Sequence, residues 1–441
     1  MVSDGGPGTV STPHHSGEPG PDAAGPRCPY AGGAPASTGS DTADEPRSLP
    51  FPDAFGLDPS PTWAALRADE PICRVRTLTG DEVWLVTRHA DVRAVLGDLR
   101  FSRALTVRPG APRTAVATPR AQAMTAMDPP DHTRLRRLVT KAFTHRRMQR
   151  MRPWITATAE ALADRLAEQP QPVDVRAHFA LPLPIAVICE LLGVPVDDRP
   201  LFQRWSEQIY SMDPARRGQV EADYGSLEHY VGELVAAKRR DLTEDRPPAD
   251  LLEELILVRD ERDALSEDEL VSLGLTLLVA GHETTANQIG SFLITLLREP
   301  VRWRRLVSAP QDIPAAVEEL LRFNRLGETG QYRVAATDVE LAGVRIRAGE
   351  GVIAAIGSAN RDDAAFERPD ELRLERADNP HLAFGHGVHH CLGAPLARVE
   401  LQETLRVLTA RFPRLSLAVA PEELRWRRVL ISGVAELPVS L

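Results

Sequence analysis

The chain of 441 residues has little cysteine and few aromatic residues, which make up 5% of it. Its four cysteines, Cys28, Cys73, Cys189 and Cys391, lie far apart and form no CxxC pair. This spacing excludes a disulfide framework and is typical of a reducing compartment, so we expect a cytoplasmic protein. No uncharged apolar run reaches the roughly 18 residues of a membrane span, and the N-terminus does not resemble a secretion signal.

Basic residues are also not in excess. The 52 Lys and Arg residues are outnumbered by 62 Asp and Glu residues, which gives a net charge of −10 and excludes a broad basic surface for nucleic acid. A G-x-G-x-x-G fingerprint after a strand is missing as well, so we expect no tightly bound flavin or nicotinamide nucleotide. Any electrons that the protein uses must therefore come from separate partners.

The hydrophobic pattern divides the chain into a tail and one large domain. Residues 1–48 are rich in Gly, Pro, Ser and Thr and cannot bury enough surface to fold, so we predict a disordered tail followed by a domain at 49–441. Helical periodicity predicts helices at about 131–142, 154–167, 183–192, 199–211, 217–241, 249–258, 266–299 and 313–323. Short strands are expected at 72–75, 83–87, 331–335, 339–347 and 351–355, with Gly343 and Gly349 as turn points and a last hairpin around 430–439. The predicted fold is mainly α with small β-sheets.

The most informative segment surrounds Cys391 and reads Phe384-Gly385-His386-Gly387-Val388-His389-His390-Cys391-Leu392-Gly393. Two glycines within three positions allow tight turns and close approach of the backbone to a flat ligand. The cysteine stands at the start of a predicted helix, where backbone N–H groups and the helix dipole favour a thiolate. A thiolate held in this way is a soft metal ligand.

Two other interpretations of this segment remain open from the residues alone. A lone cysteine is often only a small buried apolar side chain. The histidines at positions 381, 386, 389 and 390 could instead form a zinc site with Cys391. Zinc is disfavoured because no second cysteine or carboxylate stands nearby at metal-ligand spacing.

The segment resembles the haem-binding loop of the cytochrome P450 family, with the pattern F-G-x-G-x-H-x-C matched at every fixed position. The resemblance implies a single large triangular-prism domain with a long central helix over the haem. It also implies that Cys391 is the axial ligand of haem b. Around it, Phe384, Gly385, His389 and Gly393 would contact the cofactor.

The long predicted helix carries a second motif. Ser266 and Glu269 form a capping box, and the apolar centre of the helix is followed by the polar segment 280–287. A glycine and a carboxylate in a buried helix are costly, which points to a function. The alternative is that Glu283 faces solvent and Thr284 hydrogen-bonds the backbone.

This segment is similar to the A-G-x-[DE]-T-T motif of the family. The resemblance implies that the helix opens locally, that Ala280 and Gly281 leave room for dioxygen at the haem, and that Glu283 and Thr284 deliver protons to it. Such relay by a carboxylate and a hydroxyl is general acid chemistry.

Further positions match the family. Glu319 and Arg322 fit its E-x-x-R pattern, at a spacing that lets the charges pair on one helix face, and residues 360–370 with Arg376 resemble the segment that completes this structural lock. Buried haem carboxylates need cationic partners. The resemblance assigns this role to His132, Arg136, Arg333 and His389.

The resemblance implies a monomeric haem-thiolate monooxygenase that oxidises a small molecule with dioxygen and two electrons. The electrons would come from a ferredoxin and its reductase, which would dock near Arg398, and no nucleic acid or membrane partner is expected. Actinobacterial members that tailor macrolides or modified peptides are the most similar. Oxidative C–C or C–N coupling without oxygen insertion stays open, whereas a peroxide-driven enzyme or a haem sensor would not need the Glu283–Thr284 pair.

Overall fold

The computed structural model describes residues 46–52, 56, 58–114, 120–243, 246–262, 264–327, 329–427, 429–431 and 433–441. The predicted tail therefore lies almost entirely outside the described residues. Its last two residues, Arg47–Ser48, form strand β1, so ordered structure already precedes the predicted boundary at residue 49. Among the helices of the described part, none is both long and apolar enough to cross a membrane.

Helices dominate the described residues, as the sequence predicts. They are α1 (Thr62–Asp69), α2 (His89–Gly97), α3 (Asp131–Thr140), α4 (His145–Ala167), α5 (Pro182–Leu192), α6 (Arg199–Ile209), α7 (Arg217–Asp241), α8 (Leu251–Arg262), α9 (Glu267–Leu297), α10 (Pro300–Ser308), α11 (Ile313–Phe323), α12 (Ile356–Ala359) and α13 (Ala394–Arg411). The predicted start of α4 near residue 154 is wrong, because the helix continues through Pro153. Helix α2 contains residues 91–96, for which the sequence also predicts a short helix, whereas α1, α10 and α12 are not among the predicted elements.

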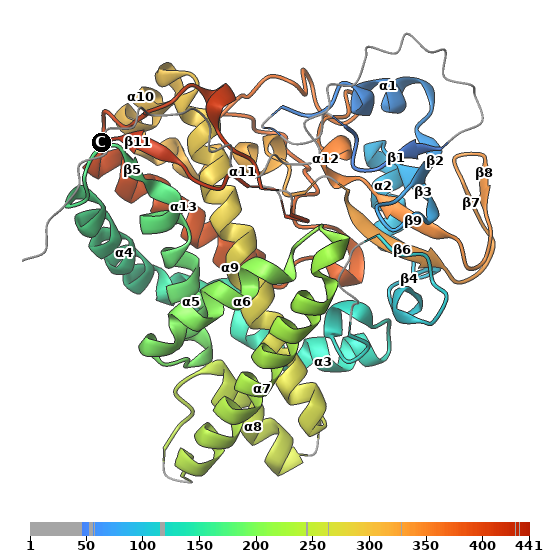
Figure 1. Ribbon diagram of the computed structural model, residues 1–441, viewed down its shortest axis with the longest axis horizontal. Coiled ribbons are helices and arrows are strands. Elements are labelled where there is room, and N and C mark those ends of the chain that lie inside the picture. Colours follow the sequence, from blue (N-terminus) through green and yellow to red (C-terminus); the bar gives the residue numbers. More distant parts are fainter. Residues whose placement is uncertain are drawn as a thin grey trace, which may run out of the picture. The chain divides into compact units, whose positions relative to one another are not determined.

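The main sheet has the strand order β1-β2-β3-β9-β6-β4. Its strands are β1, β2 (Ile72–Arg76), β3 (Glu82–Val86), β4 (Phe101–Ser102), β6 (Gln331–Ala335) and β9 (Gly351–Ala354). The predicted strand 339–347 is divided into β7 (Val339–Leu341) and β8 (Val344–Ile346), because Gly343 turns the chain at φ 82°. In the view of Figure 1 these strands gather with α1 and α2, apart from α4, α5 and α13.

The predicted hairpin around 430–439 is not formed. Strand β11 (Pro438–Ser440) pairs instead with β10 (Ser416–Leu417) and β5 (Val173–Asp174). The chain before it turns back on itself through a single bridge between Trp426 and Val434. The sequence pattern could not distinguish these partners, since strand pairing over such distances depends on the tertiary fold.

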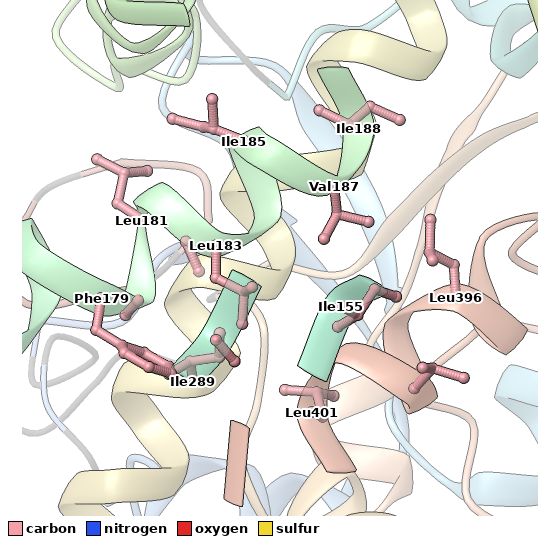
Figure 2. Packing of buried hydrophobic residues seen from close by; sticks show 14 of the residues in the cluster. Ile155, Phe179, Leu181, Leu183, Ile185, Val187, Ile188, Ile289, Leu396 and Leu401 are labelled. Carbon is pink, nitrogen blue, oxygen red and sulfur yellow. The ribbon is translucent and has the colours of Figure 1, made fainter. Parts of the chain in front are cut away.

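Helix α9 forms the centre of the apolar core and contacts α5, α7, α10 and α13. The capping box at its start is confirmed, with Glu269 N donating to Ser266 Oγ at 3.1 Å and Ser266 N donating to Glu269 Oε2 at 2.8 Å. Figure 2 shows Ile289 of α9 packed among apolar side chains of α5, α4 and α13, including Leu183, Ile155 and Leu401. This packing buries α9 on nearly all sides and fixes the segment 280–287.

The predicted lock around Glu319 is confirmed. Its carboxylate, fully buried, accepts hydrogen bonds from Arg322 Nε and Nη2, each at 2.8 Å, and from Arg376 Nε at 3.0 Å. Arg322 Nη1 also donates to the carbonyl oxygens of Asn360 and Pro369. The lock therefore fixes α11 to the segment that leads into the Cys391 loop.

Candidate active site

The Cys391 loop is shaped by its glycines. Gly385 and Gly387 adopt φ angles of 74° and 71°, in the left-handed region where a side chain would be strained. Gly387 also packs against the backbone of Leu96, where a Cβ would not fit. Cys391 N closes the loop by donating to Phe384 O at 2.8 Å, and α13 starts three residues later. The glycines therefore form the tight turns that the sequence predicts, and close approach to a flat ligand stays a prediction.

The thiol of Cys391 faces a cavity of about 350 Å³. Burial raises the pKa of this thiol above its ordinary value, although hydrogen bonds from the backbone N–H groups of Gly393 and Ala394 and the charge of Arg136 oppose the shift. The predicted preference for a thiolate is therefore outweighed in the protein by itself. A metal cation at the sulfur reverses this balance, since a coordinating thiol is deprotonated.

Helix α9 also lines the cavity, through residues that include Ala280, Gly281 and Thr284. These residues lie at i, i+1 and i+4 and so share one helix face. The expected opening does not break the helix, which is continuous from Glu267 to Leu297. Thr284 Oγ1 donates to Ala280 O at 2.9 Å, which is the backbone bond that the sequence left as an alternative.

Glu283 does not line the cavity, although every other predicted site residue does. Its side chain is fully buried on another face of α9, where Oε1 accepts hydrogen bonds from Arg427 Nη1 at 2.5 Å and Asn287 Nδ2 at 3.1 Å. Burial raises the pKa of Glu283, but the charge and hydrogen bond of Arg427 outweigh it and, with His282 and Arg176, lower the pKa. The motif thus identifies Glu283 and Thr284, but it does not predict that the carboxylate of Glu283 lies on a different face of α9 from Thr284.

A cluster of basic side chains lies at one end of the cavity. The rings of His132 and His389 are 4.2 Å apart, and Arg333 and Arg136 line the same space. Burial and the charges of neighbouring arginines lower the pKa of Arg333 to about 9 and that of His389 to about 2. In the described part of the chain, His132 Nδ1 and His389 Nε2 are buried without a hydrogen-bond partner.

Arg103 joins this cluster but is missing from the predicted set. It lines the cavity and donates to the carbonyl oxygens of Thr125 and Tyr332. Burial lowers the pKa of its guanidinium, and Asp128 is the nearest carboxylate that opposes the shift. One indirect signal was available, because Arg103 lies in a segment, residues 102–122, that shows little periodicity, and loops of that length are usually functional.

Two other predictions can be compared with these contacts. Among the described residues, no group of three His, Cys, Asp or Glu side chains is arranged to hold a metal ion, so the zinc interpretation lacks a ligand set. Arg398 is paired with Glu318 at 2.8 Å and lies over the ring of Phe384 at 4.5 Å. Its guanidinium therefore has internal partners, and since 34% of its side chain is exposed, its role in docking stays a prediction.

Comparison with known proteins agrees with this site. The family model described as "Cytochrome P450" matches residues 67–220, 220–308 and 313–421. The chain belongs to the cytochrome P450 family. It is 47% identical to nocardicin C N-oxygenase from Nocardia uniformis subsp. tsuyamanensis, over 90% of this chain and all of that protein. It is 46% identical to mycinamicin IV hydroxylase/epoxidase from Micromonospora griseorubida, over 90% of this chain and 99% of that protein.

A solved structure, HinD with NMFT and NO, matches this P450 with a TM-score of 0.85 and 45% identity, over 90% of this chain and all of that one. The chain is a P450 monooxygenase, and the family implies a haem cofactor, a small-molecule substrate and redox partners. The residues present fit a haem, because the thiol and the small residues of α9 line one cavity. The clustered basic groups with unpartnered ring nitrogens suit two carboxylates.

Proposed function

We propose that this P450 binds haem b with Cys391 as its axial ligand and oxidises a secondary-metabolite intermediate. Haem with a thiolate ligand supplies activation of dioxygen, because the sulfur pushes electron density toward the iron and favours O–O cleavage. The observation that carries the proposal is that Cys391 lines the same cavity as Ala280, Gly281 and Thr284 of α9. The small side chains leave the room that a diatomic molecule needs.

The basic cluster would bind the two haem carboxylates. His132, Arg136, Arg333 and His389 are assigned to this role, and we add Arg103, which brings a buried cation to the same end of the cavity. Burial is the main cause of the lowered pKa values of Arg333 and His389, and the mutual repulsion of the clustered cations adds to it. Neutralising this repulsion would contribute to cofactor affinity. Phe384, Gly385 and Gly393 would contact the ring as part of the cavity wall.

Glu283 and Thr284 would deliver protons to the reacting oxygen. The hydroxyl of Thr284 faces the cavity, whereas Glu283 lies one residue before it on a different face of α9. The carboxylate would take a proton from solvent and pass it to the side of the helix that Thr284 occupies. This is general acid catalysis by a positioned side chain.

The electrons would come from a ferredoxin and its reductase, and we expect a monomer in the cytoplasm, where such carriers are kept reduced. The substrate would be a macrolide or a modified peptide, since relatives that are 46–47% identical are named for mycinamicin IV and nocardicin C. Oxygen insertion would give a product heavier by one oxygen atom. Oxidative coupling would instead give a product that has lost two hydrogen atoms.

The experiment is an absorption spectrum of the reduced protein with carbon monoxide. Wild-type protein should show a strongly red-shifted Soret band that Cys391→His abolishes. Cys73→Ala is the matched control, because Cys73 is a buried thiol in the sheet and should leave the band unchanged. A band unaffected by Cys391→His would refute the ligand assignment. Titration with mycinamicin IV and nocardicin C then tests the substrate class by the shift of the Soret band.

A further inference from the structure

The turn that connects Arg425 to Ala435 carries the guanidinium that holds Glu283. Its two ends are joined by the bridge between Trp426 and Val434 and by hydrogen bonds from Arg427 N to Gly433 O at 2.8 Å and from Ala435 N to Arg425 O at 2.8 Å. The backbone of Arg427 is therefore fixed on both sides. We refer to residues 425–427 and 433–435 as the C-terminal turn.

This turn and the chain it encloses are held against the segments that surround the cavity. Leu430 N donates to Tyr210 O at 2.9 Å, just after α6, and Val429 forms a bridge with Ser211. Gly433 packs on the side chain of Asn287 in α9, where a Cβ would not fit. The position of Arg427 is thus determined by contacts with α9 and with the chain after α6.

Glu283 is turned toward this arginine and away from the cavity. Its carboxylate is completely buried, whereas the Arg427 side chain retains 15% of its exposure. Arg176 Nη2 lies 3.9 Å from the same oxygen, Oε1. The other oxygen, Oε2, is buried and has no hydrogen-bond partner in the part of the chain that the structure describes. Cations therefore hold Oε1, and Oε2 is the oxygen of Glu283 that can exchange a proton.

Among the described residues, the charged and titratable groups that interact with Glu283 come from four segments. Arg427 lies on the C-terminal turn, Arg176 on the π-helical turn η4 (Arg176–Ala180), His282 on α9 itself, and Tyr210 follows α6. The two arginines and His282 favour the carboxylate, while the Tyr210 hydroxyl donates to Val279 O at 3.1 Å and is occupied there. Arg427 makes the shortest contact with the carboxylate.

We propose that Arg427 is a positioning residue that holds Glu283 as an anion outside the cavity, in the state that accepts a proton from solvent. This inference rests on the proposed relay role of Glu283. In each cycle only O–H bonds change: Glu283 gains a proton from water, passes it toward Thr284, and returns as an anion to Arg427. Without the guanidinium, a fully buried carboxyl would stay protonated over much of the pH range, because burial raises its pKa.

The test compares Arg427→Gln with Arg425→Gln as a matched control. Arg425 stands on the same turn but pairs with Glu436 at the surface, where the side chains are 73% and 60% exposed. The measurements are the pH profile of oxygen-driven product formation, its solvent isotope effect, and product formation with hydrogen peroxide, which brings its own protons. Arg427→Lys tests whether a cation alone restores the wild-type profile.

Arg427→Gln should slow oxygen-driven turnover about tenfold. This effect is smaller than the loss of the general acid itself, which contributes at least about 100-fold. The substitution should also introduce a new ionisation at neutral to alkaline pH, increase the solvent isotope effect, and leave peroxide-driven turnover unchanged. Arg425→Gln should match wild type, and Arg427→Lys should restore most of the profile. A profile of Arg427→Gln that superimposes on that of wild type would overturn the inference.

Glu283→Gln separates this inference from the proposed function. If Glu283→Gln slows oxygen-driven turnover while Arg427→Gln has no effect, the relay stands and the role of Arg427 is refuted. If Glu283→Gln has no effect, the relay itself is wrong. Should Arg427→Gln not fold, the infrared difference between wild type and Glu283→Gln decides the matter. An ionised carboxylate band at neutral pH supports the inference, and a protonated carbonyl band overturns it.

Discussion

Replacing Glu319 by glutamine should destabilise the fold strongly, because two buried arginines share its carboxylate. The Glu319 and Arg322 side chains are fully buried, and that of Arg376 is 5% exposed. Glutamine has nearly the same size and can still accept a hydrogen bond, so the substitution removes charge and little volume. What remains is a pair of guanidinium groups in the interior without their common counter-charge.

The magnitude follows from the cost of an uncompensated buried charge. Breaking a buried ion pair by removing one partner costs about 3–5 kcal/mol, and we expect the upper end because two cations are affected. Domains are stable by only about 5–15 kcal/mol, so the loss is a large part of the total. With an m value of about 3 kcal/mol/M, the urea midpoint should fall by about 1–2 M.

The assay is urea unfolding of the holoenzyme, followed by tryptophan fluorescence and haem absorbance. Glu82→Gln is the control, because Glu82 pairs with Arg76 at 3.4 Å on the surface, where the side chains are 48% and 40% exposed. An exposed pair of this kind is worth less than about 1 kcal/mol. If Glu319→Gln lowered the stability by no more than Glu82→Gln, the reasoning about buried charge would be refuted.

Three further predictions follow from contacts in and around the cavity. A Cβ at Gly281 would lie 2.8 Å from Ile188 Cδ1, so Gly281→Val should cost about 1–3 kcal/mol and lower the Tm, and adding Ile188→Ala should restore part of the loss. The proposed pairing of Arg333 with a haem carboxylate predicts that Arg333→Leu raises the haem dissociation constant about 10- to 100-fold, whereas Arg345→Leu, at an exposed position, should not change it. Burial raises the pKa of Glu318, but hydrogen bonds from its partners outweigh this and lower it to about 2. A carboxyl with a lowered pKa contributes stability above about pH 4.3 that is lost as the pH falls toward 2. In Glu318→Gln the urea midpoint should therefore depend less on pH over that range than it does in wild type.

Much of the fold could be predicted because its signals are local. The capping box at Ser266, the turn at Gly343 and the i, i+3 spacing of Glu319 and Arg322 each depend on a few neighbouring residues. Where a local rule has an exception, prediction failed. The helix expected from about residue 154 starts at His145 instead, and Pro153 lies inside it, because tertiary packing of α4 on α13 and α5 outweighs the cost of the proline.

The residues of the candidate site likewise divide into those that a local motif reveals and those that only the tertiary structure reveals. Most predicted residues were found by motif, and the structure brings them to one cavity from α3, α9, β6 and the Cys391 loop. Arg103 and Arg427 carry no such motif, since an arginine in a loop has no periodicity that reveals where its side chain ends. Their roles become visible only when segments far apart in the chain lie side by side.

The sequence by itself determined the family and indicated Cys391, the helix segment 280–284 and the basic residues other than Arg103, because glycines, caps and fixed spacings encode them locally. Only the tertiary structure decided that Glu283 faces Arg427 rather than Thr284. The two residues are adjacent in sequence, but a helix turns successive side chains about 100° apart, and a guanidinium 144 positions along the chain determines where the carboxylate is held.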